Sequence, residues 1–411
     1  MKETILDVAL VGAGLAGLTC AGTLARGGRQ CRLFEAADQP GGRVRTESVE
    51  GYRLDRGFQV LLDAYPECRR FLDYERLRLG RFLPGALVWN GKTLHRLVDP
   101  LRHPSQLPGA LRTPPGSFTD KVRVGALKAR LSLASIERIQ ARPEIPTREA
   151  FERLGFSQSM RKGFLEPFFS GIFLEDSFST SSRMFEFVFK MFSQGSAALP
   201  HGGMQAIPDQ LAATLPPETL RLRSPVRSVH AGGLTLESGE TIQARHVVLA
   251  TDMDAASALA PGIPSRPWNS TRCLYFSTPR SPLKEPLIVL NGSGTGSFSN
   301  LSVPSDVVSG YAPGKAALLS VSLRPGFAPD PQAVMAEIRT CLGQPDLPLH
   351  FLQSYAINHA LPRQDPGDNP FGKASPRLPD GTWICGDYRD SASIDGAMRS
   401  GRKTAEALLQ A

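Results

Sequence analysis

The stretch that decides the fold lies near the N-terminus, where Ile5-Leu6-Asp7-Val8-Ala9-Leu10-Val11 runs directly into Gly12-Ala13-Gly14-Leu15-Ala16-Gly17. The apolar run predicts a buried strand, and residues 18–26 predict a helix that ends at two further glycines. Glycines in such a turn allow a tight bend, close packing of helix on strand, and close approach of the backbone to a pyrophosphate. The residues predicted to contact a dinucleotide here are Gly12, Gly14, Leu15, Ala16 and Gly17.

A second strand is predicted over residues 31–35 and ends in an acidic residue. Glu35 lies twenty-three positions after Gly12, where a carboxylate can accept hydrogen bonds from the hydroxyls of an adenosine ribose. The glycines alone would be a weak indication of a dinucleotide-binding unit. The strand before them, the helix after them and this acid make the prediction much more specific.

Length and composition exclude several classes of protein. The chain has 411 residues, of which 41% are hydrophobic, and this is enough for a large core and two or three domains. No run approaches the roughly 18 consecutive apolar residues of a membrane span, and the N-terminus does not resemble a signal peptide, so we expect a cytoplasmic protein. The six cysteines are scattered without a Cys-x-x-Cys pair, which predicts neither a metal site nor a disulfide framework.

Positive charge is concentrated in one part of the chain. Between Arg69 and Arg130 there are thirteen Lys or Arg residues against four acids, a local excess of nine, whereas the whole chain carries a net charge of +8. This pattern predicts a basic surface, which is either a solvated face or a surface for anionic lipid at a peripheral membrane site. A nucleic-acid partner is not predicted, because no DNA-binding motif or interleaved aromatic pattern accompanies the charge.

The chain is predicted to pass twice between a nucleotide-binding domain and a substrate-binding domain. Residues 1–75, 195–265 and 375–411 are assigned to the first domain, and residues 76–194 and 266–374 to the second. The second domain includes a helical insertion in which residues 121–141 have helical spacing among basic residues, as expected of an amphipathic helix packed on its own domain or lying on a membrane. Strand signals return over 220–252 and at the C-terminal 383–387. The fold class predicted is therefore α/β, with a Rossmann-type nucleotide domain and an α+β second domain.

Phenylalanine is unusually dense between residues 164 and 192. Most of these side chains are expected in the core, but the same block would build an apolar cavity for a hydrophobic ligand. Its members are Phe164, Phe168, Phe169, Phe173, Phe178, Phe185, Phe187, Phe189 and Phe192.

The sequence resembles the flavin-containing amine oxidase superfamily, and within it the branch of phytoene desaturases and protoporphyrinogen oxidases. Four separated blocks carry the resemblance: the glycine turn with Glu35 and the Gly41-Gly42-Arg43 that follows it; 55–60; 200–208 with Val226; and 384–388 with 393–401. The resemblance implies an FAD cofactor, with Arg43 adding positive charge near its pyrophosphate, Gly57 and its neighbours beneath the flavin ring, and the backbone of Val226 at the adenine. The further residues that it implies at FAD are Ala36, Gly41, Gly42, Phe58, Gln59, Val60, Gly386, Asp387, Ile394, Asp395, Gly396, Ala397 and Met398.

Two departures from the amine oxidases favour a desaturase-like enzyme. The strand predicted at 272–276 lacks the lysine that amine oxidases carry, and Ser393-Ile394-Asp395 stand where those enzymes place an aromatic residue. We therefore expect an FAD-dependent oxidoreductase that moves a hydride from a hydrophobic substrate, isoprenoid-like or porphyrinogen-like, to the flavin. The alternatives are an amine oxidase, a redox-neutral polyene isomerase, and a flavin-binding partner without turnover.

No catalytic acid or base is assigned from the sequence, and no oligomeric state is predicted. His201, His359 and Tyr355 are the residues considered, because each lies near a block that the resemblance places around the flavin. A loop histidine bonded to its surroundings is the simpler interpretation of His201.

Overall fold

The computed structural model describes residues 5–98, 115–230, 232–368 and 374–411. The first large sheet has the strand order β10-β2-β1-β13-β12-β11, with β19 also pairing with β13. Strands β10, β2, β1, β13 and β19 pair in parallel, whereas β12 and β11 continue the sheet as antiparallel strands. The bounds are β1 Leu6–Val11, β2 Cys31–Phe34, β10 Leu220–Arg221, β11 Val226–His230, β12 Gly233–Leu236, β13 Thr241–Leu249 and β19 Trp383–Ile384.

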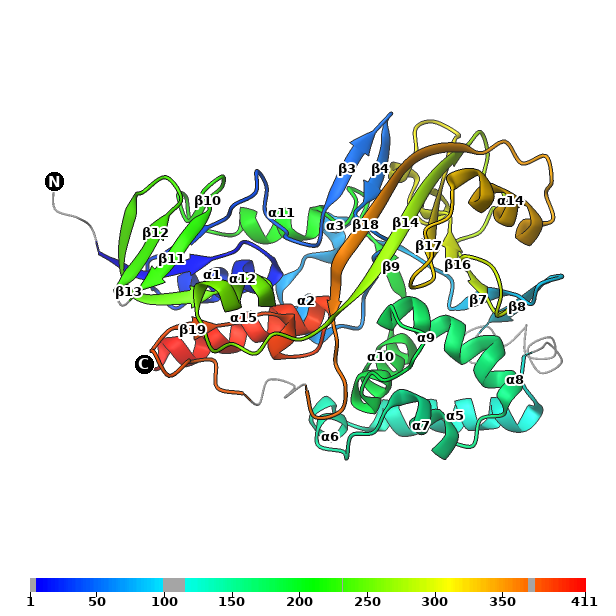
Figure 1. Cartoon of the computed structure of the whole chain (residues 1–411), viewed down its shortest axis with the longest axis horizontal. Helices are drawn as coiled ribbons and strands as arrows, with labels where there is room; N and C mark the ends of the chain where they lie inside the picture. The colour runs from blue at the N-terminus through cyan, green and yellow to red at the C-terminus, as the bar shows by residue number, and fades with distance from the viewer. Residues whose placement is uncertain (1–4, 99–114, 231, 369–373) are drawn as a thin grey trace.

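A second large sheet lies on the opposite side of the molecule (Figure 1). Its strand order is β18-β14-β17-β16-β15-β7-β8, and only the β15–β7 pair is parallel. The bounds are β7 Gly85–Trp89, β8 Leu94–Val98, β14 Trp268–Thr278, β15 Ile288–Asn291, β16 Phe298–Ser302, β17 Ala317–Leu323 and β18 His350–Pro362. A sheet with parallel strands and a separate, mainly antiparallel sheet confirm the predicted α/β class with an α+β second part; the domain boundaries stay a prediction.

Two small sheets connect these layers. The hairpin of β3 (Thr46–Val49) and β4 (Tyr52–Asp55) follows the first nucleotide-binding segment, and the other small sheet pairs β5, β9 and β6. The bounds of the latter are β5 Leu61–Leu62, β6 Gly80–Arg81 and β9 Ala197–Leu199.

Most of the helices belong to one of two groups. Helices α1 and α15 pack against each other beside the first sheet, and α5 to α10 make a layer at one end of the second sheet (Figure 1). Among the described residues no helix is long and apolar enough to cross a membrane. The bounds are α1 Leu15–Arg26, α2 Pro66–Phe71, α3 Tyr74–Leu77, α5 Phe118–Leu133, α6 Ile136–Gln140, α7 Thr147–Arg153, α8 Gln158–Met160, α9 Glu166–Phe173, α10 Ser182–Gln194, α11 Ala206–Ala213, α12 Met253–Leu259, α13 Pro304–Val307, α14 Pro331–Leu342 and α15 Ile394–Leu409.

Two boundaries differ from the sequence prediction. Helix α1 begins at Leu15 and not at residue 18, because the backbone turns into the helix as soon as Gly14 has served as its N-cap. The helix expected over 121–141 is two helices, since Ala134 is extended and Ser135 caps a new start by accepting a hydrogen bond from Arg138 N–H. Residues 99–114 of the basic region lie outside the described residues.

Candidate active site and cofactor cleft

One cavity of about 1190 Å³ runs from the glycine turn of the first sheet to the face of the second sheet. Its walls come from the turn after β1, the ends of β2 and β13, the segments 41–44 and 56–60, β18, and the start of α15. Helices α9 and α10 and strands β14 to β17 close its other end. Three of the four sequence blocks predicted to surround one cofactor therefore contribute to one cavity, and the third block, 200–208 with Val226, reaches it only through Val226.

The glycine turn leaves an open cradle at the N-terminus of α1. Gly14 caps the helix without a side chain, and a Cβ atom at Gly14 would meet nothing within 4 Å. Gly12 has φ +98°, a conformation that favours glycine, and a Cβ there would lie 3.0 Å from the carbonyl oxygen of Ala250. The exposed helix N–H groups and the positive end of the helix dipole suit an anionic group such as a pyrophosphate.

Glu35 is held at the carboxyl end of β2. Its Oε2 accepts a hydrogen bond from Ala13 N–H at 2.6 Å, and its Oε1 accepts one from Ala37 N–H at 2.8 Å. These bonds fix the carboxylate beside the turn, where it lines the cavity together with Ala36 and Val226. Each carboxylate oxygen has a further lone pair that could accept a ribose hydroxyl.

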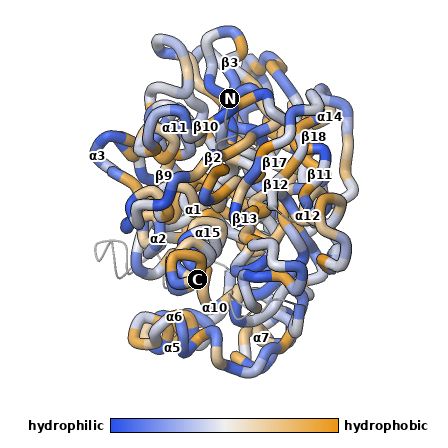
Figure 2. Tube along the Cα trace, turned by 90° about the vertical axis from the view of Figure 1, so that its left-hand side faces the viewer, coloured by the Kyte–Doolittle hydropathy of each residue, from blue (hydrophilic) through white to orange (hydrophobic). Residues whose placement is uncertain are grey.

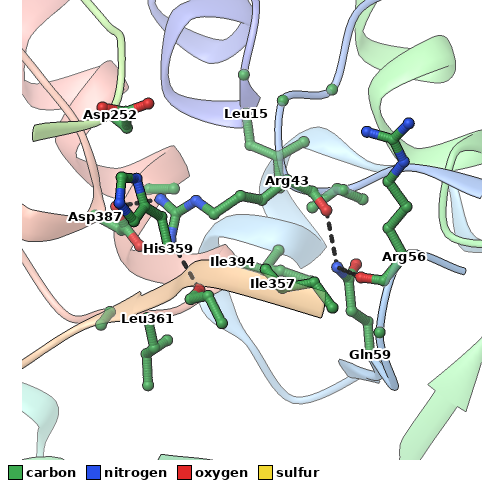
Figure 3. Close-up of a pocket in the computed structure, with 18 of the residues that line it drawn as sticks. Leu15, Arg43, Arg56, Gln59, Asp252, Ile357, His359, Leu361, Asp387 and Ile394 are labelled. Carbon is green, nitrogen blue, oxygen red and sulfur yellow. Dashed lines mark hydrogen bonds and ion pairs between the residues drawn. The ribbon is translucent and has the colours of Figure 1, made fainter. Parts of the chain in front are cut away.

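Arg43 crosses the middle of the cavity (Figure 3). Its Nη2 lies 2.6 Å from Oδ1 of Asp387, and its Nη1 donates to the carbonyl oxygen of Ala360 at 3.2 Å. The guanidinium carbon also lies 5.5 Å from the ring centre of Trp268. Burial opposes the charge on Arg43, but the Asp387 carboxylate outweighs it and raises the Arg43 pKa above its ordinary value. A permanent positive charge therefore lies in the cavity wall.

The segment after β4 forms the wall next to this arginine. Gln59 Nε2 donates to the carbonyl oxygens of Arg43 and Arg56, at 2.8 and 3.2 Å (Figure 3). Its buried Oε1 accepts no hydrogen bond from any described residue. Gly57, with φ +85°, brings the segment close to β18, since a Cβ at Gly57 would lie 3.2 Å from Cδ1 of Ile357. Oε1 of Gln59 is thus a hydrogen-bond acceptor on the cavity wall that receives no hydrogen from the described residues.

Eighteen of the twenty-two predicted cofactor residues line this cavity. The four that do not are Gly17, Asp395, Gly396 and Met398. Two of these are glycines at close contacts: a Cβ at Gly17 would lie 2.0 Å from Gly12 O, and one at Gly396 would lie 1.9 Å from Ser391 O.

Asp395 and Met398 face α2 and not the cavity. Oδ1 of Asp395 accepts a hydrogen bond from Glu67 N–H at 2.8 Å, and burial raises the pKa of Asp395 to about 6. Sδ of Met398 lies 3.8 Å from Sγ of Cys68. Residues three apart share a helix face, so Ile394 and Ala397 reach the cavity together, whereas Asp395 and Met398, each one position further along α15, face α2.

Beyond Gly57 the cavity continues into an arm without charged side chains. Its apolar lining comes from β5, the start of α2, α9, α10 and β15, and consists of Leu62, Tyr65, Phe168, Ile172, Leu174, Met184, Val188, Phe192, Ile288 and Leu290. Three small polar residues, Thr271, Asn300 and Ser322, line the same arm from the second sheet. These three were not predicted, because nothing in the sequence shows which face of a strand will meet the cavity. We refer to this part of the cavity as the apolar arm.

The phenylalanine block divides between core and cavity. Only Phe168 and Phe192 line the cavity, whereas Phe169, Phe173, Phe185 and Phe187 are at most 1% exposed and pack in the core. Phe185, for example, makes an edge contact with Phe169 at 5.1 Å between ring centres. The block therefore builds both the helical layer and one wall of the apolar arm.

The three residues considered for proton transfer have different surroundings. His201 does not line the cavity; its Nδ1 lies 3.0 Å from Nη2 of Arg78, and desolvation together with the nearby arginines lowers its pKa. His359 does line the cavity, stacked on Trp268 with ring centres 5.0 Å apart. Tyr355 also lines it, but its hydroxyl donates to Oε2 of Glu47 at 2.8 Å, and burial and this carboxylate raise its pKa. The Tyr355 proton is therefore held in place at neutral pH.

The residues present fit a bound flavin dinucleotide. The open cradle at Gly14 and the permanent charge of Arg43 suit a pyrophosphate, and the buried acceptor of Gln59 suits a ring that donates a hydrogen bond. The family model of flavin containing amine oxidoreductases matches residues 15–409. The chain belongs to this family.

Relatives of known identity match only part of the chain. Hydroxyneurosporene desaturase of Cereibacter sphaeroides is 35% identical over 106 residues, which cover 24% of this chain and 21% of the desaturase. Putrescine oxidase of Kocuria rosea is 39% identical over 80 residues, 18% of this chain and 17% of the oxidase. The matched stretches thus span about a fifth of these relatives.

Solved structures match the whole fold at low identity. Cyclohexylamine oxidase of Brevibacterium oxydans superposes with a TM-score of 0.74 over 99% of both chains at 18% identity. A protein of Exiguobacterium sp. 255-15, provisionally assigned as a protoporphyrinogen oxidase, gives a TM-score of 0.75 over 99% of both chains, also at 18% identity. Family and fold together confirm the predictions of FAD as cofactor and of a flavin-dependent oxidoreductase.

Proposed function

We propose that this protein dehydrogenates an extended, apolar substrate, introducing a carbon–carbon double bond. The observation that carries the proposal is the continuity of one cavity from the cofactor cradle into the apolar arm. A chain lying in this arm would present a carbon to the flavin while its remainder is buried among aliphatic and aromatic side chains. The substrate class best suited to such a space is isoprenoid or polyene-like.

The uncharged arm disfavours an amine substrate. No carboxylate lines it, and no lysine is among the described residues that line the whole cavity. An ammonium group that entered would lose its hydration without gaining an anionic partner, which is costly. The similarity over 106 residues to a protein named hydroxyneurosporene desaturase also supports a polyene-like substrate.

When bound, FAD would supply the acceptor for a hydride from the substrate, whose second hydrogen would leave as a proton to solvent, and dioxygen or a quinone would serve as the final electron acceptor. Gly12, Gly14 and Arg43 would hold the pyrophosphate, and Gly57 and Gln59 would border the ring. The side chains of α9 and α10 exclude water from the reacting carbon, which protects the transfer. The chain's contribution is binding and orientation.

An anaerobic titration tests the proposal. Purified protein loaded with FAD is mixed with liposomes that carry phytoene, with protoporphyrinogen, and with putrescine, and the flavin absorption is followed. We expect bleaching by phytoene and none by putrescine. Bleaching by putrescine alone would establish the amine oxidase, and bleaching by protoporphyrinogen alone would replace the polyene with a tetrapyrrole. Bound flavin that no compound bleaches would contradict the proposal and favour the redox-neutral isomerase or the partner protein.

We further propose that the substrate is taken from an anionic membrane surface by α5. Phe118, Val122 and Leu133, at spacings that share one helix face, are 65%, 54% and 86% exposed. The helix also carries four Lys or Arg residues against one Asp, and Figure 2 shows α5 at the edge of the molecule with hydrophobic and hydrophilic residues interleaved. An exposed apolar stripe beside positive charge is the pattern of a helix that lies in a lipid headgroup region.

A further inference from the structure

We propose that the apolar substrate carries a hydroxyl group, and that Asn300 and Ser322 bind it on the floor of the apolar arm. This inference rests on the proposed function and narrows its substrate class from hydrocarbons to long-chain alcohols. It is carried by the register of the second sheet, by an orphaned buried acceptor, and by the close approach of α9.

The register of the second sheet places four cavity residues in one row. Leu290 of β15 is opposite Asn300 of β16, which is opposite Ser322 of β17. Ser322 is opposite Cys273 of β14, and Cys273 is opposite Tyr355 of β18. Residues opposite each other share a face of the sheet, and Leu290, Asn300, Ser322 and Tyr355 all line the cavity. The two polar members at the centre of the row thus lie side by side beneath the apolar arm.

Asn300 has an acceptor that the protein leaves unused. The residue is 4% exposed, and its buried Oδ1 has no hydrogen-bond partner among the residues described. Its Nδ2 donates to Oγ of Ser299 at 3.2 Å, which orients the amide and leaves Oδ1 as the free end. Burying an acceptor without a donor costs free energy. A ligand group that donates a hydrogen bond to Oδ1 therefore binds more favourably here than the same bond would allow at an acceptor exposed to water.

Helix α9 is shaped to admit this amide. Gly171 lies over Asn300, and a Cβ atom at Gly171 would be 2.7 Å from Asn300 Nδ2. Gly171 itself lines the cavity, between Phe168 and Ile172 of the same helix. A glycine at this point of an otherwise bulky wall keeps a polar patch open within an apolar surface.

A hydroxyl satisfies both polar residues at once. Its O–H can donate to Oδ1 of Asn300, and its oxygen can accept from the Ser322 hydroxyl. Asn300 is three strands away from Tyr355, or about 14 Å at the usual strand separation of roughly 4.8 Å. Tyr355 is at the β18 end of the row, two residues before Ile357, which lies against Gly57. The hydroxyl would therefore be remote from the carbon that reacts. The ligand expected is a long molecule with its polar group far from the flavin.

The test compares two molecules that differ in one hydroxyl. Phytol and phytene, in the same mixed micelles, are titrated into the FAD-loaded protein, and each Kd is taken from the perturbation of the flavin spectrum. We expect phytol to bind about tenfold more tightly, the factor that one good hydrogen bond to a buried acceptor provides. The variant Asn300→Leu, similar in volume, is expected to bind phytol no more tightly than phytene, so the roughly tenfold preference of the wild type is lost.

A matched control lies on the same strand and face. Ser302 is fully buried with an Oγ that no described residue bonds, but it does not line the cavity; Ser302→Ala should keep the preference for phytol. Ser322→Ala, a smaller change than Asn300→Leu, should reduce the preference and provides a second test if the leucine variant fails to load FAD.

The outcomes separate the two proposals. Equal binding of phytol and phytene by the wild type, or a preference that survives in both Asn300→Leu and Ser322→Ala, would overturn the hydroxyl site and leave the dehydrogenation of apolar chains standing. Failure of both molecules to bind would overturn the proposed function as well.

Discussion

Arg43 and Asp387, 344 positions apart in the chain, meet at 2.6 Å between Nη2 and Oδ1 in the wall of the cofactor cavity. The pair joins the first nucleotide-binding segment to the loop after β19, and the carboxylate keeps the guanidinium charged and oriented. The ion pair thereby fixes the separation of the two segments across the wall of the cavity.

Replacing Arg43 with Met should weaken FAD binding by about tenfold or more, because a charge-assisted bond to a phosphate is worth roughly 1.5–3 kcal/mol. Equilibrium dialysis of the apoprotein against FAD measures the Kd. Arg45→Met is the control, since Arg45 pairs with Asp38 and does not line the cavity. Equal FAD affinity in the wild type and Arg43→Met would show that the charge has no part in cofactor binding.

Two helical glycines should respond in opposite ways to alanine. A Cβ at Gly401 of α15 would lie 2.1 Å from the carbonyl oxygen of Ala16 in α1, whereas a Cβ at Gly125 of α5 would meet nothing within 4 Å. Gly401→Ala should therefore lower the free energy of unfolding by about 1–3 kcal/mol. Gly125→Ala should raise it by up to about 1 kcal/mol, because alanine favours the helix. Urea denaturation measures both; a Gly401→Ala protein as stable as the wild type would mean that α1 and α15 are not locked together at this crossing.

The glycines also show how far the sequence could predict the structure. The unit from β1 to Glu35 was predictable because each step has a local cause: an apolar run, a turn that needs glycine, and an acid at the strand end. The meeting of the four blocks around one cavity came from a resemblance, since no local pattern brings Asp387 to Arg43.

The apolar arm was only partly predictable. The density of phenylalanine indicated an apolar region, but which rings reach the cavity depends on how α9 and α10 are rotated against the second sheet. Asn300 and Ser322 were missed because their role depends on a register among five strands drawn from residues 268–362. Similarly, Asp395 and Ile394 are adjacent in sequence, and only the rotation of α15 decides that Ile394 faces the cavity.

Asp55 should make stability depend on pH. It is 3% exposed, and burial raises its pKa to about 6, although Thr46, Met204 and Tyr311 all donate hydrogen bonds to it. The folded state therefore binds the proton more tightly than the unfolded state, in which the pKa is about 3.9. The contribution of protonated Asp55 to the free energy of unfolding is fully present below about pH 4. This contribution, on the order of 1–3 kcal/mol, is lost as the pH rises through about 6.

Asp55→Asn should remove this contribution, because an amide resembles the neutral acid and does not titrate. Urea denaturation between pH 4.5 and 7.5 measures the difference in unfolding free energy between the two proteins, and the comparison cancels the titration of Asp395. We expect the variant to gain stability relative to the wild type as the pH rises. A difference that stays constant across this range would show that Asp55 is ionised throughout.

The exposed stripe on α5 should determine binding to vesicles. Val122→Asp combined with Leu133→Glu places charge on a face proposed to enter lipid, and should reduce cosedimentation with phosphatidylserine vesicles at least about fivefold. Phe327→Ser is the control, because Phe327 is 44% exposed but lies outside α5. Sedimentation that is the same for all three proteins, or absent in the wild type at low salt, would contradict the proposal that α5 binds the membrane.

Narrowing the apolar arm should separate substrate oxidation from cofactor binding. Ile172 of α9 lines the arm next to Gly171 and belongs neither to the glycine turn nor to the segment 41–44. Ile172→Trp adds a large ring to this space, so we expect normal FAD content and a rate of flavin reduction by phytoene at least about tenfold lower, since a misplaced chain loses its alignment for hydride transfer. Anaerobic stopped-flow absorbance measures the rate, and Phe189→Trp, on the neighbouring helix but not lining the cavity, should leave it nearly unchanged. If phytoene reduces the flavin of Ile172→Trp at the wild-type rate, the substrate does not occupy this arm and must approach the flavin from elsewhere in the cavity.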